Sequence, residues 1–320
     1  MNLSNFTVPI ETINSPIADK VGVSILMART DSIHPLASGN KLYKLLPNID
    51  YAQQNNYQQL VSFGGAFSNH IHALALYSQS VGLQSIAIIR GEKEYASNPT
   101  LRAATTAGMT LVFVDRATYK RRYDKDYLHQ LQQQYPQALI IPEGGSSELA
   151  LQGCTELMQQ INKSCLQVDN SIPDAVAVAC GTGITFAGLV NGAQSNQTIR
   201  GYLAVKDHSV PERVDRLLAK HSQQQHYKIH PADLGGYAKL KAPLLDFILG
   251  FLQQTNILLD PIYTSKMCYQ IMQQIEAGQF EVGSKLVIVH SGGLQAWYGM
   301  KHTVVKLAGD NTWQKIKAYL

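Results

Sequence analysis

Two lysines stand beside small, turn-forming residues near the N-terminus, in the stretch "SGNKLYKLLPNIDYA". Lys41 directly follows Gly39 and Asn40, and Lys44 stands where a helical pattern begins. A lysine in water is a solvated cation and a poor nucleophile, so a chemical role requires desolvation or a carbonyl partner that converts the amine to an imine. The two lysines therefore direct attention to sites that could bind a carbonyl compound.

A glycine-rich turn follows the apolar run in "AVAVACGTGITFAG". Its backbone N–H groups, two hydroxyls and a helix N-terminus could converge on one anion, and a phosphate fits. The residues of this turn are Gly181, Thr182, Gly183, Ile184 and Thr185. Two alternatives are a tight strand-to-helix turn capped by Thr185, and a dinucleotide site in which Phe186 replaces the third glycine and Asp207 binds the ribose.

Two further glycine turns carry polar groups. In "SFGGAFSNHIHALA", Ser68 and Asn69 place a hydroxyl and an amide at the start of a helix, although a serine there is commonly an N-cap. In "VIVHSGGLQA", His290 and Ser291 follow the last apolar run, and His290 alone is typical of a packed core histidine.

The elements that position these turns follow one repeated pattern. Short β-branched runs end in glycine or polar turns and lead into helical patterns, as in "QLVSFGG", "SIAIIRGE", "MTLVFVD", "ALIIPEGG", "DAVAVACG", "IRGYLAVKD" and "KLVIVHSGG". Strands that are apolar on nearly every residue are typical of parallel sheets covered by helices on both faces. The sequence therefore predicts an α/β fold, with its ligand sites at the carboxyl ends of the strands.

Composition excludes several other classes of protein. The chain has 320 residues, a net charge of +4 and no apolar run of membrane-spanning length, so we expect one or two domains, no membrane association and a cytoplasmic location. The basic run "YKRRYDKDYLHQ" contains two aspartates and indicates a solvated helix face, so we expect no nucleic-acid partner. Four cysteines at 154, 165, 180 and 268 lack metal-site spacing and are interpreted as reduced thiols, and no metal is expected.

A lysine, a phosphate-binding turn and polar groups at strand ends form a consistent set if the ligand is pyridoxal 5'-phosphate. The same motifs carry a resemblance. "SGNKLYKLLPNIDYA", "GGAFSNHIHALA", "GTGITFAG", "GGYAKL", "LLDPIYTSK" and "HSGG" occur in this order. Over nearly the whole chain the sequence resembles the 1-aminocyclopropane-1-carboxylate deaminase and D-cysteine desulfhydrase family of fold type II pyridoxal-phosphate enzymes.

The resemblance implies a role for each matching residue. Lys41 matches the Schiff-base lysine, Lys44 a phosphate contact, and Asn69 the asparagine that holds the ring hydroxyl. Ser68 matches the serine beside the substrate, residues 181–185 match the phosphate loop, and Tyr237 and Tyr263 match tyrosines that face the substrate.

The resemblance also implies an architecture. We expect two parallel-sheet, helix-covered domains like those of the tryptophan synthase β chain, with the cofactor in the cleft between them. The large cofactor-binding domain would comprise residues 1–45 and 165–320, and the smaller inserted domain residues 46–164. A homodimer is the usual assembly of the family.

Three departures from the family pattern bear on the substrate. Thr264 and Ser291 stand where the deaminase has glutamate and leucine, which is closer to the desulfhydrase branch. A hydroxyl partner for the pyridine nitrogen gives a weaker electron sink than a carboxylate, yet one that suffices when a thiolate leaves. Phe67 replaces a glutamine that normally helps to bind the substrate carboxylate, which points to a changed substrate.

These observations predict a pyridoxal-phosphate lyase or deaminase acting on a small amino acid. Lys41, once displaced from the cofactor, is the candidate base for the α-proton. D-Cysteine, giving pyruvate, sulfide and ammonia, is the first candidate substrate, and 1-aminocyclopropane-1-carboxylate is the second. A racemase or β-replacement enzyme on the same scaffold is third, and a non-catalytic ligand-binding protein is the alternative from another class.

Overall fold

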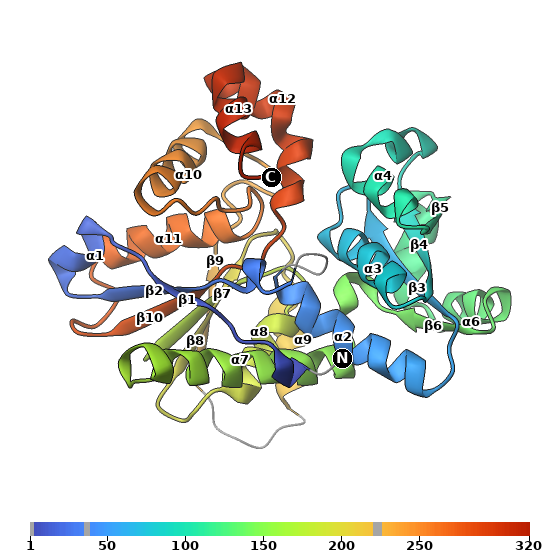
Figure 1. The fold of residues 1–320 in the computed structure, drawn as a ribbon, viewed down its shortest axis with the longest axis horizontal. Coiled ribbons are helices and arrows are strands. Elements are labelled where there is room, and N and C mark those ends of the chain that lie inside the picture. Colours follow the sequence, from blue (N-terminus) through green and yellow to red (C-terminus); the bar gives the residue numbers. More distant parts are fainter. Residues whose placement is uncertain (1–2, 35–38, 220–225) are drawn as a thin grey trace.

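The computed structural model describes residues 3–34, 39–219 and 226–320, which form two separate β-sheets (Figure 1). One sheet has six strands in the order β1-β2-β10-β7-β8-β9, and the other has four in the order β5-β4-β3-β6. The strands are β1 (Ile10–Thr12), β2 (Ser24–Ala28), β3 (Gln59–Gly65), β4 (Gln84–Arg90), β5 (Thr110–Val114), β6 (Ala138–Ile141), β7 (Ala175–Cys180), β8 (Thr198–Leu203), β9 (His226–Pro231) and β10 (Lys285–Val289).

Helices surround both sheets. They are α1 (Pro16–Val21), α2 (Asn40–Gln54), α3 (Asn69–Ser80), α4 (Pro99–Thr106), α5 (Arg116–Lys120), α6 (Lys125–Gln134), α7 (Glu148–Asp169), α8 (Ile184–Gly192), α9 (Val210–Leu218), α10 (Ala242–Thr255), α11 (Thr264–Glu276), α12 (Trp297–Ala308) and α13 (Asp310–Lys317). Within the described ranges, none of them combines the length and the apolar character needed to cross a membrane.

The strand pairing confirms the predicted α/β class with parallel sheets. Every pair of neighbouring strands is parallel except β1 and β2. The seven apolar runs of the sequence became β3 to β8 and β10. The predicted domain boundaries near residues 45 and 164 fall within α2 and α7 and stay a prediction.

Three strands were not predicted from the sequence. β1 is a short edge strand, whereas β2 lies between β1 and β10 and is buried from Ile25 to Ala28, so its apolar run after the Gly22 turn was a signal that sequence reasoning missed. β9 is the other edge strand, and its sequence "HYKIHP" is polar and mostly exposed. Edge strands bury little surface, so they lack the continuous apolar pattern of central strands.

The small sheet separates two layers of helices by the alternation of its side chains. Leu60 of β3 and Ile89 of β4 point into the core that contains α3 and α4. Val61, Phe63 and Ile88 point the other way, to a cluster that contains Tyr119 of α5 and Leu131 of α6. Opposite burial of successive residues is the two-residue period of a β-strand.

The large sheet is covered on both faces in the same way. Val176 and Val287 pack in the cluster that contains α7 and α8, whereas Ala177 and Ile288 pack against α11. The C-terminal helices α12 and α13 form a further apolar cluster with α10 (Figure 1).

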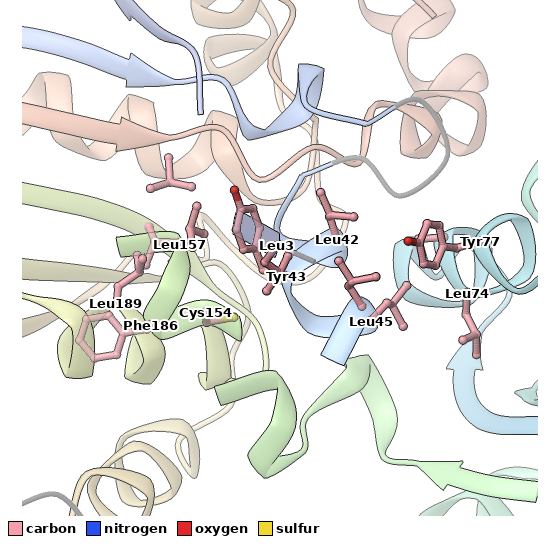
Figure 2. Close-up of a cluster of buried hydrophobic side chains, with 14 of the residues drawn as sticks. Leu3, Leu42, Tyr43, Leu45, Leu74, Tyr77, Cys154, Leu157, Phe186 and Leu189 are labelled. Carbon is pink, nitrogen blue, oxygen red and sulfur yellow. The ribbon is translucent and has the colours of Figure 1, made fainter. Parts of the chain in front are cut away.

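Helix α2 joins the two halves through one continuous core. Figure 2 shows Leu42 and Leu45 of α2 between side chains of α3, such as Leu74, and side chains of α7 and α8, such as Leu157. These four side chains are inaccessible to solvent, and Leu189 of α8 extends the same cluster. The helix that carries both lysines is therefore fixed by packing to both sheets.

The start of α2 differs from the prediction. We expected Lys41 on a turn and the helix to begin near Lys44, but α2 begins at Asn40, directly after Gly39 with φ of 73°. The apolar spacing becomes regular only at Leu42, so the first turn has no hydrophobic signal. Both lysines lie on the same helix.

A proline and a glycine let α7 approach α2 closely. Pro47 lies inside α2 and has no N–H to donate to the carbonyl oxygen of Tyr43. Gly153 of α7 packs at that carbonyl, and a Cβ atom there would lie 1.9 Å from the Tyr43 oxygen. Any side chain at residue 153 therefore forces the two helices apart.

We predict that Gly153→Ala destabilises the protein by about 1–3 kcal/mol, because the added methyl group overlaps the main chain of α2. Gly250 of α10 is the matched control, since a Cβ there meets no atom within 4 Å. Gly250→Ala should be neutral or stabilising by up to about 1 kcal/mol. Urea unfolding of both variants measures the difference, and equal effects would contradict the close approach of α2 and α7.

Candidate active site

The first turn of α2 is hydrogen-bonded to the first turn of α8. The Lys41 amine donates to Asn40 Oδ1 at 2.6 Å, and Asn40 Nδ2 donates to Thr185 Oγ1 at 2.8 Å. Asn40 is buried, so its amide connects the two helix starts inside the protein. The structure thus brings Lys41 next to the predicted anion-binding turn. Ser38, at the start of the quoted lysine motif, lies outside the described residues.

The environment of Lys41 favours a neutral amine. Burial, together with the nearby positive charge of Lys44, lowers the pKa of Lys41 to about 7, although Asp260 opposes the shift. An amine with this pKa is largely unprotonated just above neutral pH. Lys41 therefore meets the requirement of desolvation that a nucleophilic lysine has.

The turn between β7 and α8 offers donors to an anion. Gly183 is the N-cap of α8 with φ of 90° and contributes no side-chain cap, so the N–H groups of the first turn have no capping side chain. Thr185 does not cap the helix, as one alternative had it, because Gly183 is the N-cap and Thr185 lies inside α8, where its hydroxyl accepts from Asn40. A helix N-terminus without a side-chain cap favours a bound anion.

Lys44 and Thr182 lie on either side of a neighbouring loop. The Lys44 amine donates to the carbonyl oxygen of Gly144 at 3.2 Å, and Ser146 Oγ donates to Thr182 Oγ1 at 2.8 Å. Burial lowers the pKa of Lys44 as well. The loop after β6 thus bridges α2 and the anion-binding turn.

Ser68 and Asn69 lie at the start of α3. Ser68 is the N-cap, and its Oγ accepts from the N–H of Ile71 at 3.3 Å, so the interpretation of this serine as a helix cap is confirmed. The Asn69 amide oxygen accepts from Gln295 Nε2 at 2.5 Å. Gly293 also packs against Asn69, since a Cβ there would lie 2.2 Å from Asn69 Nδ2. Asn69 therefore meets the loop after β10.

Thr264 and Ser291 form a buried pair of hydroxyls. Their Oγ atoms are 3.3 Å apart, and both side chains are largely inaccessible to solvent. Ser291 also lies beside the lysine turn, because a Cβ at Gly39 would be 2.0 Å from the Ser291 carbonyl oxygen. The two residues that departed from the deaminase pattern thus lie together near the start of α2.

The two candidate tyrosines are in contact. The rings of Tyr237 and Tyr263 have centroids 6.5 Å apart in an edge-on arrangement. Tyr263 also packs against Gly181, since a Cβ there would lie 3.4 Å from the ring. Burial, together with Tyr237 and Asp260, raises the pKa of Tyr263, which keeps its hydroxyl protonated and able to donate.

Phe67 packs toward the C-terminal helices. A Cβ at Gly299 of α12 would lie 3.1 Å from the Phe67 ring, so the ring rests on the backbone of that helix. This contact joins the loop after β3 to α12, which lies in the C-terminal part of the chain. It gives Phe67 a packing partner that the sequence did not indicate.

Sequence reasoning missed Asp260. Its buried carboxylate accepts from the N–H groups of Ile262, Tyr263 and Thr264 at 3.0, 2.8 and 2.7 Å. It therefore fixes the start of α11 in the manner of an acidic helix cap. The aspartate before Pro261 in "LLDPIYTSK" was the available signal.

His70 was also missed. Ser62 Oγ donates to the carbonyl oxygen of Ile141 at 2.8 Å and lies 2.7 Å from His70 Nε2, so the hydrogen of the imidazole is on Nε2. Within the described part of the chain His70 Nδ1 has no hydrogen-bond partner. Burial, and then the charges of Lys41 and Lys44, lower the pKa of His70 to about 3. His70 is thus a neutral acceptor beside the two lysines.

These residues fit the cofactor that the sequence predicts. A neutral amine suits an aldehyde, whereas the start of α8 with Lys44 suits a phosphate. The donors Asn69 and the pair Thr264 and Ser291 are of the kind that contacts a polar aromatic ring. Among the described residues, no cluster of His, Cys, Asp and Glu has the geometry of a metal site.

Comparisons with known proteins agree with this chemistry. The family model described as "Pyridoxal-phosphate dependent enzyme" matches residues 7–292. The chain is 26% identical to the bifunctional D-cysteine desulfhydrase/1-aminocyclopropane-1-carboxylate deaminase of Arabidopsis thaliana, over 97% of this chain and 82% of that protein. It is 24% identical to the D-cysteine desulfhydrase of Klebsiella pneumoniae, over 93% and 98% of the two chains.

A solved structure shares the fold. The crystal structure of a 1-aminocyclopropane-1-carboxylate deaminase homologue superposes with a TM-score of 0.82 at 21% identity, over 96% of this chain and 95% of that one. The predicted fold type is therefore confirmed.

We predict that acylation of Lys41 in the cofactor-free protein rises with a midpoint near pH 7, because the reagent reacts only with the neutral amine. Exposed lysines should titrate near their usual pKa of about 10.4. Competitive labelling with acetic anhydride, read by peptide fragmentation that separates Lys41 from Lys44, measures both.

Lys44→Met tests how much the charge of Lys44 contributes to the lowered pKa of Lys41. The variant should move the Lys41 midpoint to higher pH, because it removes a neighbouring positive charge that disfavours protonation. A midpoint for Lys41 near that of exposed lysines would contradict the desolvated amine.

Proposed function

The chain belongs to the pyridoxal-phosphate-dependent enzyme family, and on this premise we propose that it eliminates the β-substituent of a small amino acid, with D-cysteine as the substrate. The products are pyruvate, sulfide and ammonia, formed with the consumption of one water. The observation that carries the choice of substrate is the buried hydroxyl pair of Thr264 and Ser291, 3.3 Å apart.

The cofactor, when bound, supplies an aldehyde that couples to amines and a ring that stabilises negative charge at the α-carbon. In this proposal Lys41 holds the cofactor at rest, because its amine is neutral near physiological pH. Lys44 and the residues of the turn at 181–185 hold the phosphate. Asn69 holds the ring hydroxyl.

The hydroxyls of Thr264 and Ser291 contact the pyridine nitrogen in this proposal. A hydroxyl leaves the ring a weaker electron sink than a carboxylic acid or carboxylate would. Loss of a thiolate, a good leaving group, needs less stabilisation than cleavage of a carbon–carbon bond. The pair therefore favours elimination from D-cysteine over opening of the cyclopropane ring.

Lys41 is the proposed base. Its neutral Nζ would take the proton from the α-carbon of the substrate. Ser68, at the N-terminus of α3, is proposed to lie beside the substrate carboxylate, which the helix start favours electrostatically. Tyr237 and Tyr263 are proposed to face the substrate on the other side.

The packing of Phe67 affects which groups can bind the carboxylate of the substrate. Because its ring packs on Gly299 of α12, we propose that the carboxylate is bound by the start of α3 without a side-chain amide from residue 67. The homodimer belongs to the same proposal and rests on the resemblance alone, whereas the cytoplasmic location stays the expectation drawn from the sequence.

We predict pyruvate and sulfide from D-cysteine, with little or no 2-oxobutyrate from 1-aminocyclopropane-1-carboxylate. The holoenzyme is incubated with each compound, and sulfide and 2-oxo acids are quantified. Efficient release of 2-oxobutyrate by the unmodified enzyme would reverse the order of the two substrates. A yellow protein that is inactive on both would refute D-cysteine and point to another amino acid.

Variants of Thr264 test the role of the buried hydroxyl pair in the reaction. Thr264→Val removes the hydroxyl at nearly constant volume and should lower the rate of sulfide release roughly tenfold, the value of about one hydrogen bond. Thr264→Ser, which keeps the hydroxyl, is the matched control and should stay close to the unmodified enzyme. The double change Thr264→Glu with Ser291→Leu should also reduce sulfide release. Equal rates for the Val and Ser variants would show that the Thr264 hydroxyl does not contribute to sulfide release.

A further inference from the structure

Lys266 is a buried cation that is bound by main-chain oxygens. Its side chain is 0% exposed, and its Nζ donates to the carbonyl oxygens of Ala204, Asp233 and Gly236 at 3.4, 2.8 and 2.7 Å. No carboxylate in the described ranges forms an ion pair with it. Three acceptors around one nitrogen require three N–H donors, which only the ammonium form provides.

The three carbonyl groups come from segments that need to be held together. Ala204 follows β8, and Asp233 and Gly236 belong to the loop after β9, whereas Lys266 lies on α11. The ammonium therefore ties the ends of two neighbouring strands to the helix that begins beside Tyr263.

The loop after β9 has a strained backbone. Leu234, Gly235, Gly236 and Ala238 all have positive φ, at 47°, 100°, 127° and 54°. Two of these residues are not glycine, and a left-handed conformation is strained for them unless the surroundings enforce it. Tyr237 lies in the middle of this loop, and its ring contacts Tyr263.

We propose that the Lys266 ammonium is a built-in monovalent cation that holds the Tyr237 loop in place, and that the three carbonyl oxygens form a cation site once the side chain is shortened. Lys266 is a positioning residue, since it acts through Tyr237. The part of the inference that concerns activity rests on the proposed function, whereas the cation site does not.

The chemistry of the site selects the ion. Main-chain carbonyl oxygens replace the hydration shell of potassium in proteins, whereas calcium and magnesium sites use carboxylates. The site has carbonyl oxygens and no carboxylate ligand, and the ion it holds now has a single charge. Potassium and ammonium are therefore the expected ligands in a variant that lacks the amine.

Thermal unfolding tests the cation site without any substrate. Lys266→Ala leaves space at the three oxygens, whereas Lys266→Met fills that space without a charge and is the matched control. At equal ionic strength, potassium or ammonium chloride should raise the Tm of Lys266→Ala by about 2–4 °C over tetramethylammonium chloride. The unmodified protein and Lys266→Met should show no such difference. An Ala variant that is equally stable in all three salts, or unfolded in all three, would overturn the cation site.

A double-mutant cycle tests the positioning role. Lys266→Met should lower kcat for sulfide release by roughly tenfold, and it should have almost no further effect in a Tyr237→Ala background, because the tyrosine that it positions is already gone. Additive losses would overturn the action through Tyr237. If D-cysteine is not a substrate, the proposed function fails, and the Tm measurements still decide the cation site.

Discussion

Desolvation of the Lys41 amine is the constraint on which the candidate site depends. A lysine on an exposed helix stays protonated, but Lys41 is held where burial and Lys44 lower its pKa to about 7. The position of α2 makes this possible, because Leu42 and Leu45 are fixed in a core that both sheets share. Packing that appears purely structural thus sets the protonation state of the proposed reactive group.

The other charged groups of the site are held mainly by the main chain rather than by ion pairs. Asp260 accepts three backbone N–H groups, and Lys266 donates to three backbone carbonyl oxygens. Hydrogen bonds of this kind stabilise a buried charge while fixing the segment that supplies them. Asp260 fixes the start of α11, and Lys266 is proposed to hold the loop of Tyr237, so two buried charges organise the side of the site that carries the tyrosines and Thr264.

The sequence predicted the parts of the molecule that repeat a strong local pattern. The central strands are continuously apolar, and the turn at 181–185 combines glycine with hydroxyls, so both were recognisable from their residues. Edge strand β9 and the first turn of α2 have no such pattern, because tertiary contacts determine them. Asp260, His70 and Lys266 were missed for a related reason: their importance comes from burial and from partners distant in sequence, which no spacing of residues shows. The contact of Phe67 with Gly299 is a further example.

In the proposed site Lys41 carries the cofactor. Reduction of the purified holoenzyme with sodium borohydride, followed by peptide mapping, tests it most directly, and Lys41→Ala provides the control without the amine. We predict that the cofactor becomes fixed to Lys41 and that the variant retains none after reduction and unfolding. Cofactor fixed to Lys44, or to no residue of a cofactor-saturated protein, would show that Lys41 does not carry it.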